Sequence, residues 1–273
     1  MSIAVARKKL DNLRKNIAGL ESAALAFSGG VDSTFLLKVG KDVLGKKFMA
    51  VTAQSPTYPK AELEFAKKKA GKLGVELLVI KTREMKSKSF TGNPPDRCYY
   101  CKGELFREMR KICNAKNIKH VIAGNNADDL KDFRPGMKAG RECGVRNPLA
   151  ECGLTKNEIR LLSREMGLDT WDKPSMACLA SRFPYGRNIK AKALAMVEKA
   201  ERCLTDLGFA QVRVRHYGDT CRIEVLPEKI SALAAPAVGK KVAERLKKLG
   251  YKYITIDIQG YRTGSMNETL EGR

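Results

Sequence analysis

One segment near the N-terminus constrains the fold of this chain most. The apolar run Ala23–Phe27 has the length of a buried strand, and Ser-Gly-Gly-Val-Asp-Ser follows it at positions 28–33. Thr34–Gly40 then continues as an apolar helix. A strand that turns into a helix through a glycine-containing loop is typical of parallel α/β sheets. Ligands of such sheets bind beyond the carboxyl ends of the strands, and this loop lies at one of those ends.

Strand and helix patterns alternate after this loop. Further strands are predicted at Phe48–Thr52, Val75–Lys81, Val121–Ala123 and, as a short fifth strand, Val145–Leu149. Helices are predicted at residues 8–20, Lys60–Leu73, Glu104–Ala115 and Thr155–Met166. Thr155 and Glu158 have the spacing of a capping box at the start of the last helix. The alternation predicts an α/β protein with a parallel, doubly wound sheet.

The pattern changes after about Phe183. A helix is predicted at Ala191–Leu207, a hairpin at residues 211–226, a helical stretch from Pro227 and a last strand at Tyr251–Ile258. The hairpin turns at Tyr217-Gly-Asp, between two segments that alternate with a period of two. We therefore expect two domains, residues 1–183 with the parallel sheet and residues 184–273 as a smaller α+β domain, with a hinge at Pro184-Tyr-Gly.

Composition narrows the function classes. The 273 residues contain no apolar run of the roughly 18 residues that a membrane span needs, and no signal-peptide core precedes the first basic residues, so we expect a cytoplasmic protein. A reducing compartment disfavours disulfides, so we expect some of the eight cysteines to bind metal or to take part in catalysis. The net charge of +22 favours anionic partners, nucleic acid included. Solvated helix faces explain lysine runs such as Lys67–Lys69 equally well.

The glycine loop has the chemistry of a phosphate site. Gly29 and Gly30 let backbone N–H groups approach an anion, the helix dipole favours negative charge, and the hydroxyls of Ser28 and Ser33 add donors. The loop lacks the Gly-Lys-Ser/Thr of a Walker A motif, so it suits a pyrophosphate leaving group and adenylation. Asp32 either binds Mg²⁺ or caps the helix. An ordinary strand–helix turn can also contain Ser-Gly-Gly.

Three cysteines have ligand-like positions. Cys98 and Cys101 form a C-x-x-C pair, and Cys178 stands alone further on. Three thiolates can hold a [4Fe–4S] cluster with one iron open. A C-x-x-C pair also occurs in zinc sites and redox disulfides, although neither His120 nor His216 has ligand spacing from a cysteine. The other cysteines have the pattern of small buried residues: Cys113, Cys143, Cys152, Cys203 and Cys221.

Several motifs resemble one family. The loop at 28–33 is similar to the PP-loop of the ATP pyrophosphatases, and segments along nearly the whole chain resemble the LarE sulfur transferases. These segments are Thr52-Ala-Gln-Ser-Pro, Pro95-Asp-Arg-Cys-Tyr-Tyr-Cys-Lys, Gly124-Asn-Asn-Ala-Asp-Asp, Asp132-Phe-Arg-Pro-Gly, Arg146-Asn-Pro-Leu, Lys173-Pro-Ser-Met-Ala-Cys-Leu-Ala-Ser-Arg and Gln259-Gly-Tyr-Arg-Thr-Gly-Ser-Met-Asn. The resemblance implies that ATP and Mg²⁺ adenylate a carboxylate of a pyridinium dicarboxylate mononucleotide. Sulfur then replaces oxygen, which gives the thiocarboxylates of the nickel-pincer cofactor and releases AMP and pyrophosphate.

The resemblance also implies roles for single residues. Cys178 matches a cysteine that in one LarE type gives up its own sulfur, whereas Cys98 and Cys101 make this chain similar to a three-cysteine variety. In that variety a cluster with bound sulfide would let the enzyme turn over repeatedly. The resemblance implies that Arg213, Arg215 and Arg262 bind the phosphate of the substrate. It implies that Glu201 and Glu224 bind a metal ion, and that Gly124 and Asp128 bind the nucleotide. Taken alone, the arginines and glutamates are typical of a solvated surface. Asp128 and Asp129 follow a strand end on the ligand side of the sheet, and they either bind Mg²⁺ or cap a helix.

Two rival functions share these features. A cluster-dependent tRNA thiolase of the same superfamily would explain the positive charge, but no RNA-binding module is recognisable. A non-catalytic nucleotide-binding regulator would need the loop but not the cysteines. We expect a sulfide source or a sulfur-donating protein as partner, no membrane, and a homo-oligomer.

Overall fold

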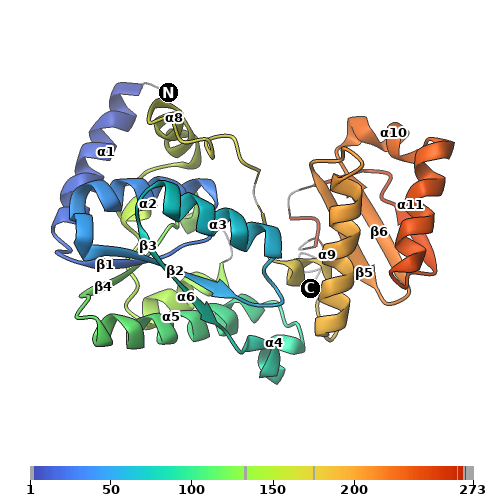
Figure 1. Cartoon of the computed structure of the whole chain (residues 1–273), viewed down its shortest axis with the longest axis horizontal. Helices are drawn as coiled ribbons and strands as arrows, with labels where there is room; N and C mark the ends of the chain where they lie inside the picture. The colour runs from blue at the N-terminus through green and yellow to red at the C-terminus, as the bar shows by residue number, and fades with distance from the viewer. Residues whose placement is uncertain (1–2, 132–133, 175, 263, 267, 269–273) are drawn as a thin grey trace. The chain divides into compact units, whose positions relative to one another are not determined.

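Figure 1 shows the computed structural model of the chain, which describes residues 3–131, 134–174, 176–262, 264–266 and 268. The chain forms two compact units. Unit 1 comprises Met1–Phe90 and Asp96–Met176, and unit 2 comprises Thr91–Pro95 and Ala177–Arg273. Each unit has its own sheet and its own apolar core. The domain boundary predicted at residues 183 and 184, and the roles predicted for the two domains, stay predictions.

Unit 1 is built on a parallel sheet of four strands, which confirms the predicted fold class. The strands are β1 (Ala23–Ala26), β2 (Phe48–Gln54), β3 (Glu76–Lys81) and β4 (His120–Ala123), in the order β3-β2-β1-β4. The chain moves from β1 outward to β2 and β3, and it returns to place β4 on the other side of β1. The direction of winding therefore switches between β1 and β4, and ligands of such sheets bind at this point.

Helices cover both faces of this sheet (Figure 1). On one face lie α1 (Ile3–Ala18), α2 (Val31–Leu44), α3 (Lys60–Lys72) and α8 (Lys156–Glu165). On the other lie α5 (Arg97–Ala115) and α6 (Pro135–Glu142). Apolar side chains at helical spacing hold α1 in place, because Leu10, Leu13 and Ile17 are all buried. Shorter helical pieces are η1 (Gly45–Lys47), η2 (Glu84–Lys86), α4 (Lys88–Thr91), η3 (Asp128–Lys131) and α7 (Pro148–Glu151).

The strand predicted at Val145–Leu149 is wrong. Arg146 makes an isolated bridge with Ile122 of β4, and α7 already begins at Pro148. Proline has no N–H for a ladder hydrogen bond, and its fixed φ suits the first position of a helix. The capping box at Thr155 is confirmed: its hydroxyl accepts from the N–H of Glu158, and the Glu158 carboxylate accepts from the N–H of Thr155.

The helix predicted from Glu104 begins earlier, at Arg97. Its buried residues occur mainly from Gly103 onward, so the apolar pattern of the sequence did not reach its first turns. Cys98 and Cys101 consequently lie within the first five residues of α5.

Unit 2 contains a sheet of three strands with helices packed on it. The strands are β5 (Val212–Tyr217), β6 (Thr220–Val225) and β7 (Tyr253–Ile256), in the order β5-β6-β7. The first two form the predicted antiparallel hairpin, and β7 pairs parallel with β6. The helices are α9 (Ala191–Thr205), α10 (Ile230–Ala234), α11 (Pro236–Lys248), η4 (Leu179–Arg182) and η5 (Pro227–Lys229).

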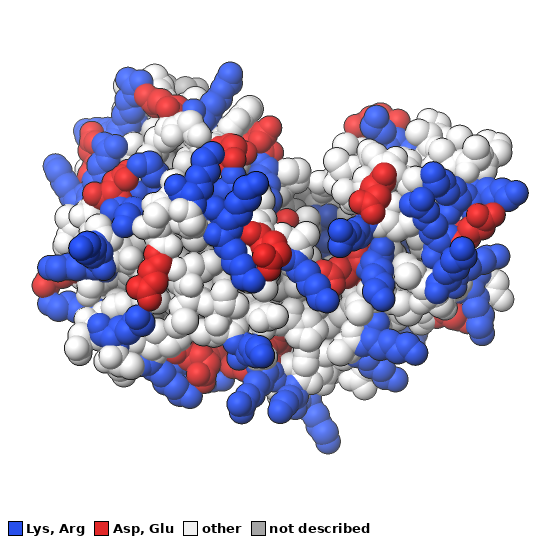
Figure 2. Space-filling view, viewed as in Figure 1, with Lys and Arg blue, Asp and Glu red and all other residues white. Residues whose placement is uncertain are grey.

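Positive charge is spread widely over the surface. Lys and Arg side chains lie across the face shown in Figure 2, with Asp and Glu side chains between them. The prediction of a solvated lysine face is confirmed for Lys67 and Lys68, which are exposed. It is wrong for Lys69, which is buried, forms an ion pair with Asp169 and lies over the ring of Phe65. None of the described helices is long and apolar enough to span a membrane.

Candidate functional site

The glycine loop connects β1 to α2 at the switch point of the sheet. Gly29 has a φ of +68°, in the left-handed region that favours glycine. A Cβ atom at Gly29 would lie 3.3 Å from the ring of Phe65 on α3. Gly30 directly precedes the first residue of α2, whose first N–H groups have no partner within the helix. The loop therefore presents a helix N-terminus at the carboxyl edge of β1, which is a site suited to an anion.

Side-chain hydrogen bonds hold this loop in shape. The hydroxyls of Ser28 and Ser33 lie 3.1 Å apart, and the Ser33 hydroxyl donates to the carbonyl of Gly30 at 3.1 Å. Tyr58 donates its hydroxyl to the carbonyl of Ser28 at 2.6 Å. Burial raises the pKa of Tyr58 above its ordinary value, so this residue acts as a neutral donor. These hydrogen bonds fix the conformation of the loop.

Gly124 places the end of β4 directly against α2. A Cβ atom at this position would lie 3.2 Å from both the N and the Cα atoms of Ser33. Such a contact is tighter than most, so a residue without a side chain suits this close approach of the two backbones. Gly124 therefore lets the end of β4 lie against the first turn of α2 beside the switch point, and its role in binding a nucleotide stays a prediction.

Asp32 has one carboxylate oxygen paired and one without a partner. Its Oδ2 atom lies 2.7 Å from Nζ of Lys156 and 3.4 Å from Nδ2 of Asn126. Its Oδ1 atom is buried and has no hydrogen-bond partner among the described residues. A buried carboxylate oxygen without a donor is an atom that a hard cation satisfies well. The residue therefore fits the predicted Mg²⁺.

Asp128 caps the start of helix α8 in this structure. Its Oδ2 atom accepts a hydrogen bond of 2.8 Å from the backbone N–H of Lys156, the first residue of α8. Its neighbour Asp129 accepts from the N–H of Asn126 at 3.0 Å and forms an ion pair with Arg134 at 2.8 Å. Burial raises the pKa of Asp129. Both carboxylates thus order the turn after β4 and the start of α8.

Two lysines that sequence reasoning missed reach the loop from elsewhere in unit 1. Lys156 comes from α8 and pairs with Asp32, as described above. Lys173 lies 3.2 Å from the carbonyl of Gly29, forms an ion pair of 2.7 Å with Glu62, and lies 3.5 Å from the ring centre of Phe65. Lys173 begins one of the motifs quoted above, but among 52 Lys and Arg residues the sequence did not show that either lysine reaches the loop. They supply positive charge that a Walker lysine would supply from within the loop itself.

The three predicted cysteines come from both units. Cys98 and Cys101 are three residues apart on α5 and so share one face of its first turns, and both are half-buried. Cys178 belongs to unit 2, where it directly precedes η4 and is also half-buried. No disulfide joins any of the eight cysteines, all of which are described. Among the described residues, no three His, Cys, Asp or Glu side chains form a group able to hold a metal ion. The convergence of these three thiols stays a prediction.

The two arginines predicted on β5 differ in their surroundings, although both are 5% exposed. Arg215 donates to both carboxylate oxygens of Glu224 at 2.8 and 2.6 Å, to the carbonyl of Ser181 at 2.9 Å and to the hydroxyl of Ser265 at 2.9 Å. Arg213 donates to the carbonyl of Val212 at 2.8 Å and lies 5.3 Å from the ring centre of Tyr261.

Electrostatics separate these two arginines further. Burial, and next the charge of Arg182, lower the pKa of Arg213. An anion would relieve this cost, because it would replace the lost hydration of a buried cation. The charge of Glu201 offsets part of this cost for Arg213, and Glu224 offsets it for Arg215 through two hydrogen bonds.

Glu201 is half-buried and Glu224 is buried. Glu201 accepts from Arg182 at 2.8 and 2.9 Å and from the N–H of Val214 at 2.9 Å. Glu224 is fully buried and accepts from Arg222 at 3.0 Å as well as from Arg215. Arginine donors occupy both oxygens of each carboxylate. The metal role that the resemblance implied for them has no support from this arrangement.

Arg262 is the most exposed of the predicted anion-binding arginines. It lies 3.2 Å from a carboxylate oxygen of Glu268 and 3.6 Å from one of Asp257. Its hydrogen bond with Glu268 raises its pKa. Of the quoted motifs, five residues lie outside the described part of the chain: Asp132, Phe133, Ser175, Thr263 and Asn267.

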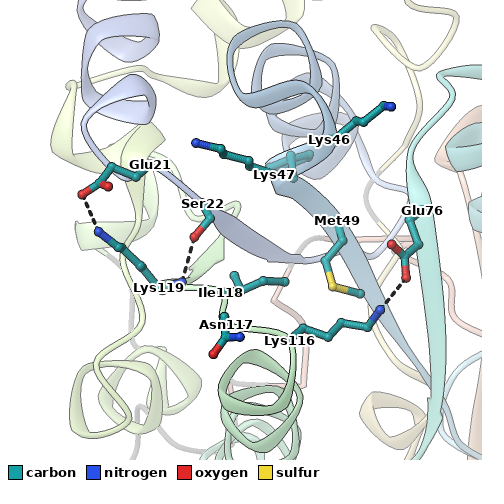
Figure 3. A pocket seen from close by; sticks show the side chains of 11 residues that line it. Glu21, Ser22, Lys46, Lys47, Met49, Glu76, Lys116, Asn117, Ile118 and Lys119 are labelled. Carbon is teal, nitrogen blue, oxygen red and sulfur yellow. Dashed lines mark hydrogen bonds and ion pairs between the residues drawn. The ribbon is translucent and has the colours of Figure 1, made fainter.

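A separate hollow of about 480 Å³ lies at the amino ends of the strands (Figure 3). Lys116 forms an ion pair of 3.0 Å with Glu76 there, and Lys119 one of 2.7 Å with Glu21 (Figure 3). None of the predicted site residues lines this hollow. The loop, Gly124 and Asp32 gather at the opposite, carboxyl ends of the sheet.

Comparisons with known proteins give the family. No family model matches the chain. An uncharacterized protein of Synechocystis sp. is 42% identical over 262 residues, which cover 96% of this chain and 98% of that one. The pyridinium-3,5-bisthiocarboxylic acid mononucleotide synthase of Lactiplantibacillus plantarum is 36% identical over 252 residues, 92% of this chain and 91% of the synthase.

A more distant likeness covers about half of the chain. One subunit of the glutamine-hydrolyzing GMP synthase of Archaeoglobus fulgidus is 28% identical over 157 residues, 54% of this chain and 51% of that protein. This likeness agrees with a PP-loop fold for the parallel sheet. Because the similarity to the synthase of L. plantarum extends over nearly the full length of both proteins, the chain belongs to the LarE family of PP-loop sulfur transferases.

Proposed function

We propose that this protein is an ATP-dependent sulfur transferase that adenylates a carboxylate of a pyridinium dicarboxylate mononucleotide and inserts sulfur to form a thiocarboxylate. The product would serve synthesis of a nickel-pincer cofactor. The observation that carries the proposal is the 36% identity to a pyridinium-3,5-bisthiocarboxylic acid mononucleotide synthase over 92% of the chain. The anion-binding loop at the switch point of the sheet supports it.

The first step is an adenylation. A carboxylate oxygen of the substrate attacks the α-phosphorus of ATP, and the bond to pyrophosphate breaks. The first N–H groups of α2 and the hydroxyls of Ser28 and Ser33 would hold the departing phosphates, where negative charge develops. Lys156 and Lys173 would add positive charge beside the loop. In the second step sulfide attacks the acyl carbon, and AMP leaves with the original carboxylate oxygen.

Mg²⁺ fits beside this loop. The unpartnered Oδ1 atom of Asp32 would be its protein ligand, and the phosphates of ATP would supply others. When bound, the metal neutralises charge on the leaving pyrophosphate. The other Asp32 oxygen is already paired with Lys156, which leaves Oδ1 for the metal.

Cys98, Cys101 and Cys178 would hold a [4Fe–4S] cluster. The donor chemistry fits, because two thiols share one face of a helix and all three are partly accessible. When bound, the cluster supplies an open iron for sulfide delivered from solution or by a sulfur-donating protein. The alternative is a sacrificial Cys178, which would lose its own sulfur to the product. A cytoplasmic location and a homo-oligomer stay predictions.

The products of ATP test the proposed reaction. With the pyridinium dicarboxylate mononucleotide and sulfide present, we expect AMP and pyrophosphate in equal amounts, together with a product in which sulfur replaces oxygen. Ion-exchange chromatography and mass spectrometry measure both. ADP and phosphate as products would contradict the assignment of the loop. Turnover that needs tRNA instead of the pyridinium nucleotide would point to the rival thiolase.

Arg213→Ala should weaken substrate binding by about one to two decades. Losing one charge-assisted hydrogen bond costs about 1.5–3 kcal/mol, and because burial lowers the pKa of Arg213, a bound anion would stabilise its charged form. Arg262→Ala tests the more exposed arginine in the same way. Calorimetric titration with the mononucleotide measures the dissociation constants, and Arg245→Ala on α11 is the control. Unchanged affinity in both site variants would return these arginines to a structural role.

A further inference from the structure

Two buried arginines hold the backbone around Cys178. Arg182 is fully buried and donates from Nη1 to the carbonyls of Ala177 at 2.8 Å and of Cys178 at 3.1 Å. Arg215 donates from Nη1 to the carbonyl of Ser181 at 2.9 Å. Three of the five carbonyls from 177 to 181 therefore accept from a guanidinium. All of these residues belong to unit 2.

In each arginine, the edge of the guanidinium opposite to these carbonyls pairs with a glutamate. Arg182 uses Nε and Nη2 for Glu201 at 2.8 and 2.9 Å, and Arg215 uses Nε and Nη2 for Glu224 at 2.8 and 2.6 Å. A bidentate pair sets the plane of the guanidinium, so the remaining Nη1 donor points in one direction. A lysine cannot make both contacts, because its ammonium lacks this fork.

The same contacts connect the cysteine segment to β5. Glu201 accepts from the N–H of Val214, between Arg213 and Arg215. Arg215 itself lies on β5, and Glu224 lies on the neighbouring strand β6. The backbone that carries Cys178 and the strand that carries Arg213 are thus held to each other through two ion pairs.

We propose that Arg182–Glu201 and Arg215–Glu224 are positioning pairs, which fix the Cys178 backbone relative to the anion-binding strand β5. This inference rests on the proposed function in assigning Cys178 to sulfur transfer. It gives both glutamates a role as partners of arginine in place of the metal role that the family resemblance implied. Reactions of oriented groups are sensitive to displacements of about 1 Å, so a loosened Cys178 would react slowly even with substrate bound.

The double variant Arg182→Met/Glu201→Gln tests the proposal. It removes both charges together, which avoids leaving one of them buried without its partner. The Glu201→Gln change keeps a carbonyl oxygen as the acceptor for the N–H of Val214. The bonds to the carbonyls of Ala177 and Cys178 are lost. Arg222→Gln is the matched control, since Arg222 also pairs with Glu224 but its ion pairs reach no residue from 177 to 181.

Two readouts do not depend on activity. In metal-free protein, we expect amide hydrogen exchange of the peptide spanning 177–182 to become at least tenfold faster in the double variant. Alkylation of Cys178 by iodoacetamide should accelerate by a similar factor, while Cys98 and Cys101 keep their wild-type rates as internal controls. The Arg222→Gln control should match the wild type in both measurements.

Kinetics then separate positioning from substrate binding. We expect kcat to fall at least 100-fold in the double variant with KM changed less than threefold, and Arg182→Lys to recover little of the loss. Wild-type exchange and alkylation in a folded double variant would overturn the proposal. If exchange rises throughout unit 2, the pair is a general stabiliser and the proposal is also wrong. Failure of the wild type to form thiocarboxylate would refute the proposed function while leaving the exchange result intact.

Discussion

Replacing Cys98, Cys101 or Cys178 by alanine, one at a time, should remove nearly all iron from anaerobically purified protein. The wild type should be brown and hold about four irons per chain, because three thiolates suffice for a [4Fe–4S] cluster with one open iron. Two remaining thiolates would not retain it. Iron analysis and the absorbance near 400 nm measure the loss, and we expect less than a tenth of the wild-type iron in each variant.

Cys113→Ser is the matched control for these variants. Cys113 lies on the same helix α5, is fully buried among apolar residues, and burial raises its thiol pKa, so it has the properties of a core residue. This variant should keep its iron. With sulfide supplied, the wild type should make more than one product per chain, and Cys178 should keep its mass. A loss of H₂S from Cys178 after one turnover would identify a sacrificial donor and refute the cluster mechanism.

Asp32→Ala should lower kcat/KM for ATP by at least about 100-fold, a loss of more than about 2.7 kcal/mol of transition-state stabilisation. The variant removes the unpartnered Oδ1 atom that would hold Mg²⁺ and releases Lys156 from its ion pair. Asp32→Asn keeps the size of the side chain and removes its charge. It should be almost as inactive if metal binding is the cause. Steady-state assays of pyrophosphate release at several Mg²⁺ concentrations measure the effect.

Asp42→Ala supplies the comparison on the same helix. Asp42 lies on α2, is partly exposed, and forms an ion pair of 2.6 Å with Lys38 one turn earlier. An exposed pair of this kind contributes about 0.3–0.5 kcal/mol, so this variant should keep wild-type activity. Equal losses in Asp32→Ala and Asp42→Ala would show that α2 responds to any loss of negative charge. Asp32 would then have no special role.

Local patterns in the sequence predicted most of the elements of the fold. The apolar strand, the glycine loop and the following helix occur in the predicted order, and so do the capping box at Thr155 and the hairpin around Gly218. These features depend on neighbours a few residues apart, which the sequence displays directly. The strand predicted at Val145–Leu149 failed for a local reason as well, because Pro148 starts a helix.

The sequence did not predict contacts between segments that lie far apart along the chain. Lys156 reaches Asp32 across 124 positions, and Lys173 reaches Gly29 across 144. Lys156 resembles other lysines at the start of a helix, and the motif that begins at Lys173 does not show which group its ammonium meets. The packing of α8 and the segment after it beside the loop decides which lysines reach the loop.

The chain by itself determined the chemistry available to this protein: a helix N-terminus after a buried strand, three ligand-like thiols and a set of arginines. The tertiary structure decided which of these groups are already engaged. Arg215 and Arg213 look alike in the sequence, two residues apart on one strand. In the fold, Arg215 is fixed between Glu224 and Ser181, whereas Arg213 lies by the ring of Tyr261 and burial lowers its pKa. The physical reason is that the environment of a buried charge is set by side chains from other segments, and the fold alone brings those segments together.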